Sequence, residues 1–216
     1  MAEATLPKEH EVAHHFDDLE QEFESHRMGM WLFLASEIMM FGALLVGGFL
    51  LLYRFPGAFA EGSAALDWRM GTVNTFFLLT SGFTMAMAAF HGQRGNQSKV
   101  RLNLWLSIAF ASAFLVVKYF EYSSKIHHGL LPGNLWSATG YSDPHTHLFF
   151  GYYFTATGLH VVHVLVGIGL MFWCLLVSRK VKFTRAYITP VELSGLYWAL
   201  IDLVWFVLFP LLYLVG

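Results

Sequence analysis

Cysteine is almost absent from this 216-residue sequence, and charged residues are scarce. The one cysteine, Cys174, lies in an apolar stretch, so the chain has no disulfide framework, no Cys-x-x-Cys-His haem attachment motif and no thiolate copper or iron–sulfur site. Charged residues make up 13% of the chain, against about 25% in soluble domains, and the mean hydropathy is +0.52. These values predict an integral membrane protein, and any redox chemistry near it is expected to belong to another chain.

The sequence also lacks a basic surface suited to nucleic acid and the pattern of a signal peptide. The formal net charge is -2, and no block of Lys and Arg is interleaved with aromatic residues, which excludes a nucleic-acid surface. Residues 1–27 are acidic and polar, with no apolar segment behind a basic start, so we expect no cleavable signal peptide. We expect residues 1–27 to form a solvated, partly helical cytoplasmic segment, and the first apolar span to direct membrane insertion.

Long apolar runs fill the rest of the sequence. The longest, residues 148–177, has no Asp, Glu, Lys or Arg. As a helix rising about 1.5 Å per residue it would be about 45 Å long, which exceeds the roughly 30 Å hydrocarbon core of a bilayer. The pattern therefore predicts an all-α membrane protein in which residues 28–216 form a bundle of five transmembrane helices. The expected spans are about 28–53, 71–91, 102–122, 148–177 and 193–215.

The distribution of Lys and Arg predicts the orientation of these spans. With five spans, the N-terminus and the second and fourth loops share one side, which carries nine of the 13 Lys and Arg residues. The other side carries three, and Lys118 lies within a span. The positive-inside rule then places the N-terminus in the cytoplasm and the C-terminus in the periplasm. No internal repeat is visible, which argues against the two-halves architecture of many transporters.

Two acidic residues interrupt the apolar spans. Glu37 and Asp202 each lie nine residues into their span from the cytoplasmic side, and we expect them at similar depth. A charged group facing lipid at the bilayer centre costs at least about 2.5 kcal/mol, so both side chains should face protein or water. Two interpretations stay open for them: a role in proton handling, and a hydrogen bond that joins two helices.

Pairs of ionisable residues three positions apart occur in two spans. His160 and His163 lie on one helix face, but two ligands so placed cannot bind opposite faces of one haem iron. No Glu-x-x-His motif accompanies them on a facing helix. We expect no metal site in this chain and neutral imidazoles that hydrogen-bond between helices. Lys118 and Glu121 are expected to form an ion pair at the membrane interface.

Five sequence motifs occur in the predicted spans. They are WLFLASEIMMF at 31–41, NT and LLTSG within 74–82, YFEY at 119–122, TGLHVVH at 157–163 and YWALIDLVW at 197–205. Together they resemble subunit III of haem-copper oxidases, in its five-helix bacterial form. The motifs occur in the family's order, which is more specific than any one motif, and the likeness covers about residues 27–216. One position departs from the family pattern Tyr-Trp-His-Phe-Val-Asp, because Ala199 stands where the histidine is usual.

The resemblance implies a non-catalytic subunit of a respiratory oxidase of the bacterial inner membrane, which reduces oxygen to water and pumps protons. Subunit I would be its main partner, with subunit II, small subunits and a larger respiratory supercomplex as further ones. Haem and copper are expected in subunits I and II, and bound phospholipid in this chain. The implied proton-related or interhelical residues are Glu37, Asp202, Glu121, His160 and His163, and the implied packing or lipid-cleft residues are Trp31, Asn74, Trp198 and Trp205.

Alternative functions remain open at this point. The chain could be the accessory subunit of a quinol oxidase or of a nitric oxide reductase, since other subunits bind the electron donor. It could also be an independent five-helix transporter or proton channel, in which Glu37, Asp202 and the histidines form the pathway. The absence of an internal repeat counts against this last function.

Overall fold

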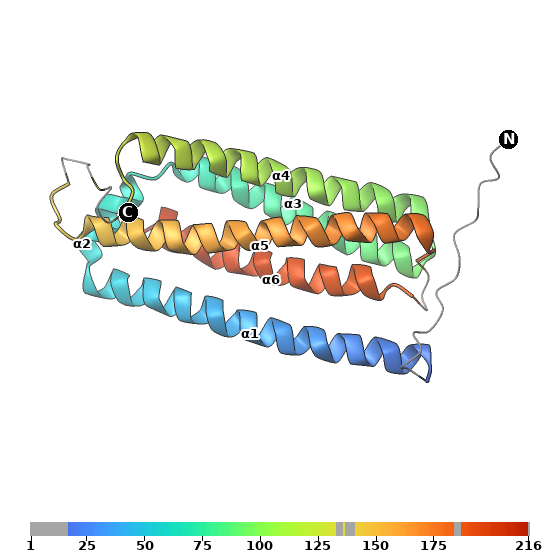
Figure 1. Ribbon diagram of the computed structural model, residues 1–216. Coiled ribbons are helices and arrows are strands. Elements are labelled where there is room, and N and C mark those ends of the chain that lie inside the picture. Colours follow the sequence, from blue (N-terminus) through green and yellow to red (C-terminus); the bar gives the residue numbers. More distant parts are fainter. Residues whose placement is uncertain (1–16, 133–135, 137–140, 184–186, 216) are drawn as a thin grey trace.

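The computed structural model describes residues 17–132, 136, 141–183 and 187–215, and its described part is built from helices (Figure 1). All of these helices except the short α2 are long and apolar enough to cross a membrane, which confirms the predicted all-α membrane protein with five spans. The helices are α1 (Leu19–Arg54), α2 (Pro56–Ala64), α3 (Trp68–Gln93), α4 (Gln97–His127), α5 (Thr146–Lys180) and α6 (Thr189–Tyr213).

Helices α3 to α6 form the main bundle, and α1 lies along one side of it, chiefly against α6 (Figure 1). Small hydroxyl side chains join the closest pair, α3 and α4. Ser81 Oγ donates to the Ser107 carbonyl oxygen over 2.9 Å, and Thr84 Oγ1 lies 2.7 Å from Ser107 Oγ. Short polar side chains of this kind let transmembrane helices approach closely and hydrogen-bond.

Aromatic side chains fill the centre of the bundle. Trp198, Trp205 and Tyr153 are at most 1% exposed. Gly167 on α5 makes room for Trp198, because a Cβ atom there would lie 2.5 Å from the indole ring. The outer faces of the helices are apolar. On α1, for example, Met39 is 76% exposed. An apolar exterior of this kind suits a surface that faces lipid or other membrane subunits.

The first helix begins before its predicted membrane span. Asp18 caps α1 by accepting a hydrogen bond from the Gln21 backbone N–H over 2.7 Å, so the helix starts at Leu19. The last part of the acidic segment is therefore helical and continuous with the first span. Its first 16 residues, with Lys8, lie outside the described residues.

The connection between the first two predicted spans contains the short helix α2. Phe55 interrupts the helix, but Pro56 then occupies the first turn of α2, where its missing N–H is not needed. Glu61 on α2 accepts hydrogen bonds from the backbone N–H groups of Ser142 and Asp143, at 3.1 and 3.2 Å. These partners lie about 80 residues away along the chain. The contacts that hold α2 in place are therefore not visible in the local sequence around Pro56.

Candidate functional site: buried polar groups between the helices

Glu37 on α1 meets His163 on α5. Glu37 Oε2 lies 3.0 Å from His163 Nε2, and each side chain is 14% exposed. His163 Nδ1 lies 2.8 Å from the Leu159 carbonyl oxygen, and the Phe41 ring packs on the imidazole with centroids 4.9 Å apart. This contact ties α1, the least buried span, to the main bundle.

The hydrogen bond from His163 to the Leu159 carbonyl oxygen determines which of the two ring nitrogens is free to contact Glu37. A carbonyl oxygen only accepts, so Nδ1 must carry the hydrogen that bonds Leu159. The remaining contact, Nε2 to Oε2, then needs one proton, which can reside on the imidazole or on the carboxyl group. The contact between Glu37 and His163 is therefore a single hydrogen bond that joins α1 to α5.

His160 has very different surroundings, although it is only three residues away. Its ring is fully buried between Phe114 and Trp205, with centroid distances of 5.6 and 5.2 Å. Neither ring nitrogen has a hydrogen-bond partner. His160 therefore does not form the expected interhelical hydrogen bond. Three residues are slightly less than one helical turn, so the two side chains point in somewhat different directions. His160 meets α4 and α6, whereas His163 meets α1.

The ion pair of Lys118 and Glu121 forms inside the bundle. Nζ lies 3.0 Å from Oε2, and both side chains are 2% exposed. Nζ also donates to Tyr213 Oη over 2.7 Å, while the Tyr153 and Tyr213 hydroxyls donate to Glu121 Oε1 over 2.8 and 2.5 Å. The predicted pair exists, and the packing of the helices buries it within the bundle. The i, i+3 spacing predicts that two side chains meet, whereas the packing of α5 and α6 decides which helix face is covered.

Asp202 lies apart from Glu37. Its Oδ2 sits against Gly82 of α3, where an added Cβ would lie 2.3 Å away. Its Oδ1 is buried and has no hydrogen-bond partner, and the same holds for Trp198 Nε1. The two intramembrane acids therefore belong to separate sites, one shared with α5 and one with α3.

The remaining predicted site residues divide between the core and the surface. Asn74 is fully buried, with neither amide atom hydrogen-bonded. Its neighbour Thr75 accepts a hydrogen bond from Trp205 Nε1 over 3.0 Å, which links α3 to α6. Trp31 is 56% exposed on α1, and Ala199 is exposed on α6. The hydroxyl partners of the ion pair, Tyr153 and Tyr213, were not among the predicted site residues.

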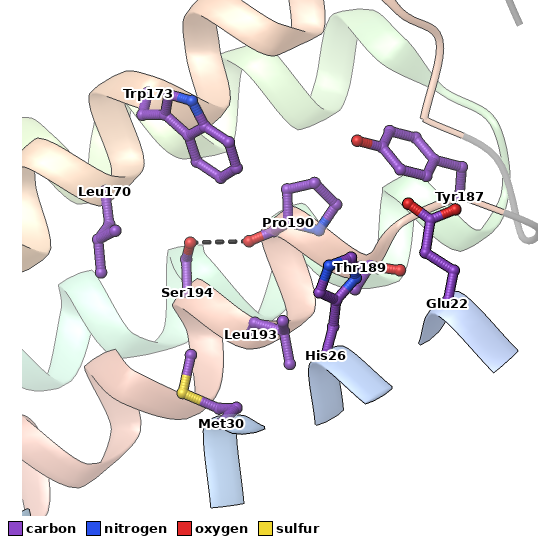
Figure 2. Close-up of a pocket in the computed structure, with 10 residues that line it drawn as sticks. All are labelled: Glu22, His26, Met30, Leu170, Trp173, Tyr187, Thr189, Pro190, Leu193 and Ser194. Atoms are coloured by element: carbon purple, nitrogen blue, oxygen red, sulfur yellow. Dashed lines mark hydrogen bonds between the residues drawn. The ribbon is translucent and has the colours of Figure 1, made fainter. Parts of the chain in front are cut away.

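A cavity of about 360 Å³ lies where the start of α1 faces α5 and α6 (Figure 2). Met30, Leu170 and Trp173 form an apolar part of its wall, and Glu22 and His26 of α1 form a polar part that faces the loop before α6. A second hollow, of about 640 Å³, lies where α1 meets Leu196 of α6. Glu24, Arg27, Met28 and Trp31 line its α1 side.

A further polar cluster lies outside the spans, between α2 and the start of α5. Thr146 Oγ1 donates to Glu61 Oε2 over 3.1 Å, beside the two backbone bonds described above. These hydrogen bonds, the one from the Asp143 N–H first, lower the pKa of Glu61 below its ordinary value of 4.5. The His145 N–H, which donates to Asp143 Oδ1 over 2.8 Å, likewise lowers the pKa of Asp143.

Within the described part of the chain, no group of three or more His, Cys, Asp or Glu side chains is arranged to hold a metal ion. Cys174 is buried and lies 3.4 Å from both the Pro190 carbonyl oxygen and Ser194 Oγ. What the buried groups can do chemically is bind, hold or exchange protons and join helices.

Comparison with known proteins decides the family. The profile of the family described as Cytochrome c oxidase subunit III matches residues 10–216. The chain belongs to this family. The resemblance seen in the five sequence motifs is thereby confirmed, and subunit III chains of this family are components of haem-copper terminal oxidases.

Individual relatives of this subunit III chain differ in the oxidase they are named for. A cytochrome c oxidase subunit 3 from Alkalihalophilus pseudofirmus is 30% identical over 88% of this chain and 86% of its own length. A quinol oxidase subunit 3 from Bacillus spizizenii is 27% identical over 88% and 86%. A haem-copper oxidase subunit I+III from Aeropyrum pernix is 29% identical over 88% of this chain, which spans only 22% of that longer protein.

Proposed function

We propose that this chain is the non-catalytic subunit III of a respiratory haem-copper oxidase in the cytoplasmic membrane of a bacterium. Subunit I of that complex would reduce oxygen to water and pump protons, with haem and copper held in subunits I and II. Family membership supports this function, and the fused subunit I+III relative supports subunit I as the main partner. The predicted orientation places the N-terminus in the cytoplasm and the C-terminus in the periplasm.

The single observation that carries a proton-related role is the contact of Glu37 with His163. Glu37 Oε2 lies 3.0 Å from His163 Nε2, each side chain is 14% exposed, and the contact links α1 to the bundle. Ionisable groups at such positions are commonly part of proton pathways. In this role, Glu37 and His163 hold a proton close to subunit I and so sustain its proton uptake and its stability during turnover.

The hollows beside α1 support a second part of this function, the binding of phospholipid. The wall around Met30 and Trp173 suits an acyl chain. In the neighbouring hollow, the Arg27 guanidinium can bind a phosphate group, and Trp31 belongs at the level of the headgroups. Phospholipid held there would stabilise the docking of α1 on α6.

The experiment that tests the function is purification of the complex in mild detergent, followed by assay of Glu37→Gln. Glutamine keeps the volume and hydrogen bonding of the side chain but removes its ionisation. We expect copurification with haem-containing subunits and normal initial turnover. Proton uptake at high pH, or the number of turnovers before inactivation, should decrease. Glu20→Gln, an exposed change on the same helix, is the matched control.

If no oxidase subunit copurified, the assignment as subunit III would fall, and the independent transporter would be favoured. If the subunits copurified but Glu37→Gln matched the parent at every pH, the proton-related role alone would be rejected. The electron donor is a separate question, since relatives are named for both cytochrome c and quinol. Oxidation of reduced cytochrome c or of a quinol by the purified complex distinguishes these.

A further inference from the structure

Polar side chains hold the start of α4 against the end of α5 (Figure 1). Gln97 Nε2 donates to the carbonyl oxygens of Ser178 and Val181 over 2.9 and 3.3 Å. Its Oε1 accepts from the Phe183 N–H over 3.0 Å. Arg101 Nη2 donates to the Ser178 carbonyl oxygen over 2.6 Å. Because the last carbonyl groups of a helix have no partner within it, these bonds cap α5 and fix the Arg101 guanidinium beside the residues that follow Ser178.

Four cations gather where these two helices meet. Arg179 and Lys180 lie in the last turn of α5, Lys182 follows it, and Arg101 lies across from them on α4. Arg101 is half-buried, and the other three are exposed. Within the described residues, none of the four forms an ion pair with a carboxylate. These four residues, the basic junction, therefore present a positive charge that attracts anions.

The surface next to the basic junction is apolar and aromatic. Trp105 lies one turn after Arg101 on the same side of α4 and is 50% exposed. Phe172 lies two turns before Arg179 on the same side of α5 and is 48% exposed. Tryptophan is enriched at the level of the lipid headgroups. The cations are thus placed where a membrane surface meets the hydrocarbon, beside side chains that face lipid.

The start of α1, at the same end of the bundle, has the opposite charge (Figure 1). Residues 17–24 contain five carboxylates and no Lys or Arg, and Arg27 is the first cation after them. An anionic headgroup is repelled by these carboxylates and attracted by the basic junction. The charge distribution therefore separates this region from the hollow beside Arg27 and favours an anionic ligand at α4 and α5.

We propose that the basic junction binds the phosphate group of an anionic phospholipid, whose acyl chains lie along Trp105 and Phe172. Arginine binds phosphate through parallel N–H bonds, and the bond to Ser178 uses one of the several N–H donors of Arg101. Basic pockets between transmembrane helices at a membrane surface bind headgroups of this kind. This site goes beyond the proposed function, since it requires a membrane but no partner subunit.

Native mass spectrometry of the purified, delipidated protein tests the charge preference. The protein should bind dioleoyl-phosphatidylglycerol at least about fivefold more tightly than dioleoyl-phosphatidylcholine, which has the same chains and a zwitterionic headgroup. In Arg179→Gln/Lys182→Gln, the affinity for phosphatidylglycerol should fall roughly tenfold, with phosphatidylcholine unchanged. Both substitutions are at exposed positions and leave the Arg101 cap in place, so the melting temperature should not change.

Lys99→Gln is the matched control. Lys99 is an exposed cation on α4, but two residues of helix place it on nearly the opposite side from Arg101. Its replacement should change phosphatidylglycerol binding by less than about twofold. A phosphatidylglycerol with a photoreactive acyl chain should crosslink to the peptides that contain Trp105 or Phe172, and the crosslink should be lost in Arg179→Gln/Lys182→Gln.

Three results would overturn the proposal. Equal binding of the two lipids would show that the headgroup charge is not recognised. An equal loss in Lys99→Gln and Arg179→Gln/Lys182→Gln would assign the binding to the general charge of this end of the bundle. Competition by inorganic phosphate or glycerol phosphate as effective as that by phosphatidylglycerol would show that the site takes a free phosphate. None of these results would affect the assignment as subunit III.

Discussion

Lys118 Nζ lies 3.0 Å from Glu121 Oε2, with both side chains 2% exposed at the meeting point of α4, α5 and α6. Two tyrosine hydroxyls complete the cluster, and the ammonium group lies 4.9 Å from the centre of the Trp205 ring. Every ionic atom of the pair is thus hydrogen-bonded within the bundle. Such a pair is stable as a unit and vulnerable when one member is removed.

We therefore predict that Lys118→Met destabilises the subunit by about 3–5 kcal/mol, because it leaves the Glu121 carboxylate buried without its cation. The double variant Lys118→Met/Glu121→Gln should recover most of this loss. Thermal unfolding of the purified protein measures both. Lys99→Met, at an exposed position on the same helix, should change stability by less than about 0.5 kcal/mol. Equal effects of the buried and exposed changes would contradict the prediction.

A hydrophobic carbodiimide should label Glu37 in preference to the eight acidic residues of segment 1–27. The reagent partitions into the membrane, where Glu37 is 14% exposed beside His163. Mass spectrometry of digested, labelled complex locates the modified carboxyl group, and the Glu37→Gln variant should show no labelling in that peptide. Modification confined to the N-terminal segment would mean that Glu37 is not accessible from the lipid phase.

The two histidines of α5 should respond differently to replacement by alanine. His163→Ala removes the bond to Glu37, worth about 0.6 kcal/mol and at most about 1.7, and should loosen α1 from the bundle. His160→Ala leaves a cavity between Phe114 and Trp205 and should cost about 2–5 kcal/mol, as other large core truncations do.

Both histidine variants should retain oxygen reduction in whatever complex remains assembled. Protease sensitivity of α1, melting temperature and oxygen consumption are the three measurements. Complete loss of oxygen reduction in an intact complex would assign a catalytic role to the histidine concerned, against the proposed function.

The contact between α2 and the start of α5 should weaken in acid. Because hydrogen bonds lower the folded-state pKa of Glu61, its contribution is fully present above the unfolded value of about 4.5 and is lost as the pH falls below it. The protection factors of the Ser142 and Asp143 amides, which are the exchange rates corrected for the intrinsic rate at each pH, should therefore fall below about pH 4.5. In Glu61→Gln this loss of protection on acidification should be much smaller, and an unchanged pH profile would exclude Glu61 as its source.

The chain expressed and purified alone should bind neither haem nor copper in stoichiometric amounts. Both ring nitrogens of His163 are already engaged, by Leu159 and Glu37, and the His160 ring is enclosed by aromatic side chains. The absorbance spectrum of the isolated chain should lack a Soret band, and metal analysis should find no copper. Stoichiometric haem lost on replacing either histidine would refute the accessory role.

The sequence by itself determined the features that depend on composition and local spacing. Apolar runs longer than a bilayer is thick predicted five spans. The i, i+3 spacing of Lys118 and Glu121 predicted that the two side chains would meet, and they do. The five ordered motifs identified the family, which the match over residues 10–216 then established.

Only the tertiary structure decided which faces of these helices meet. A span that is apolar all round carries no periodic signal for its buried face. Glu37 and His163 are 126 positions apart, so their contact could not be predicted from spacing. The same holds for the contact of Asp202 with Gly82 and for the burial of the Lys118 pair among α4, α5 and α6. Each depends on how separate helices pack, and local sequence does not contain that information.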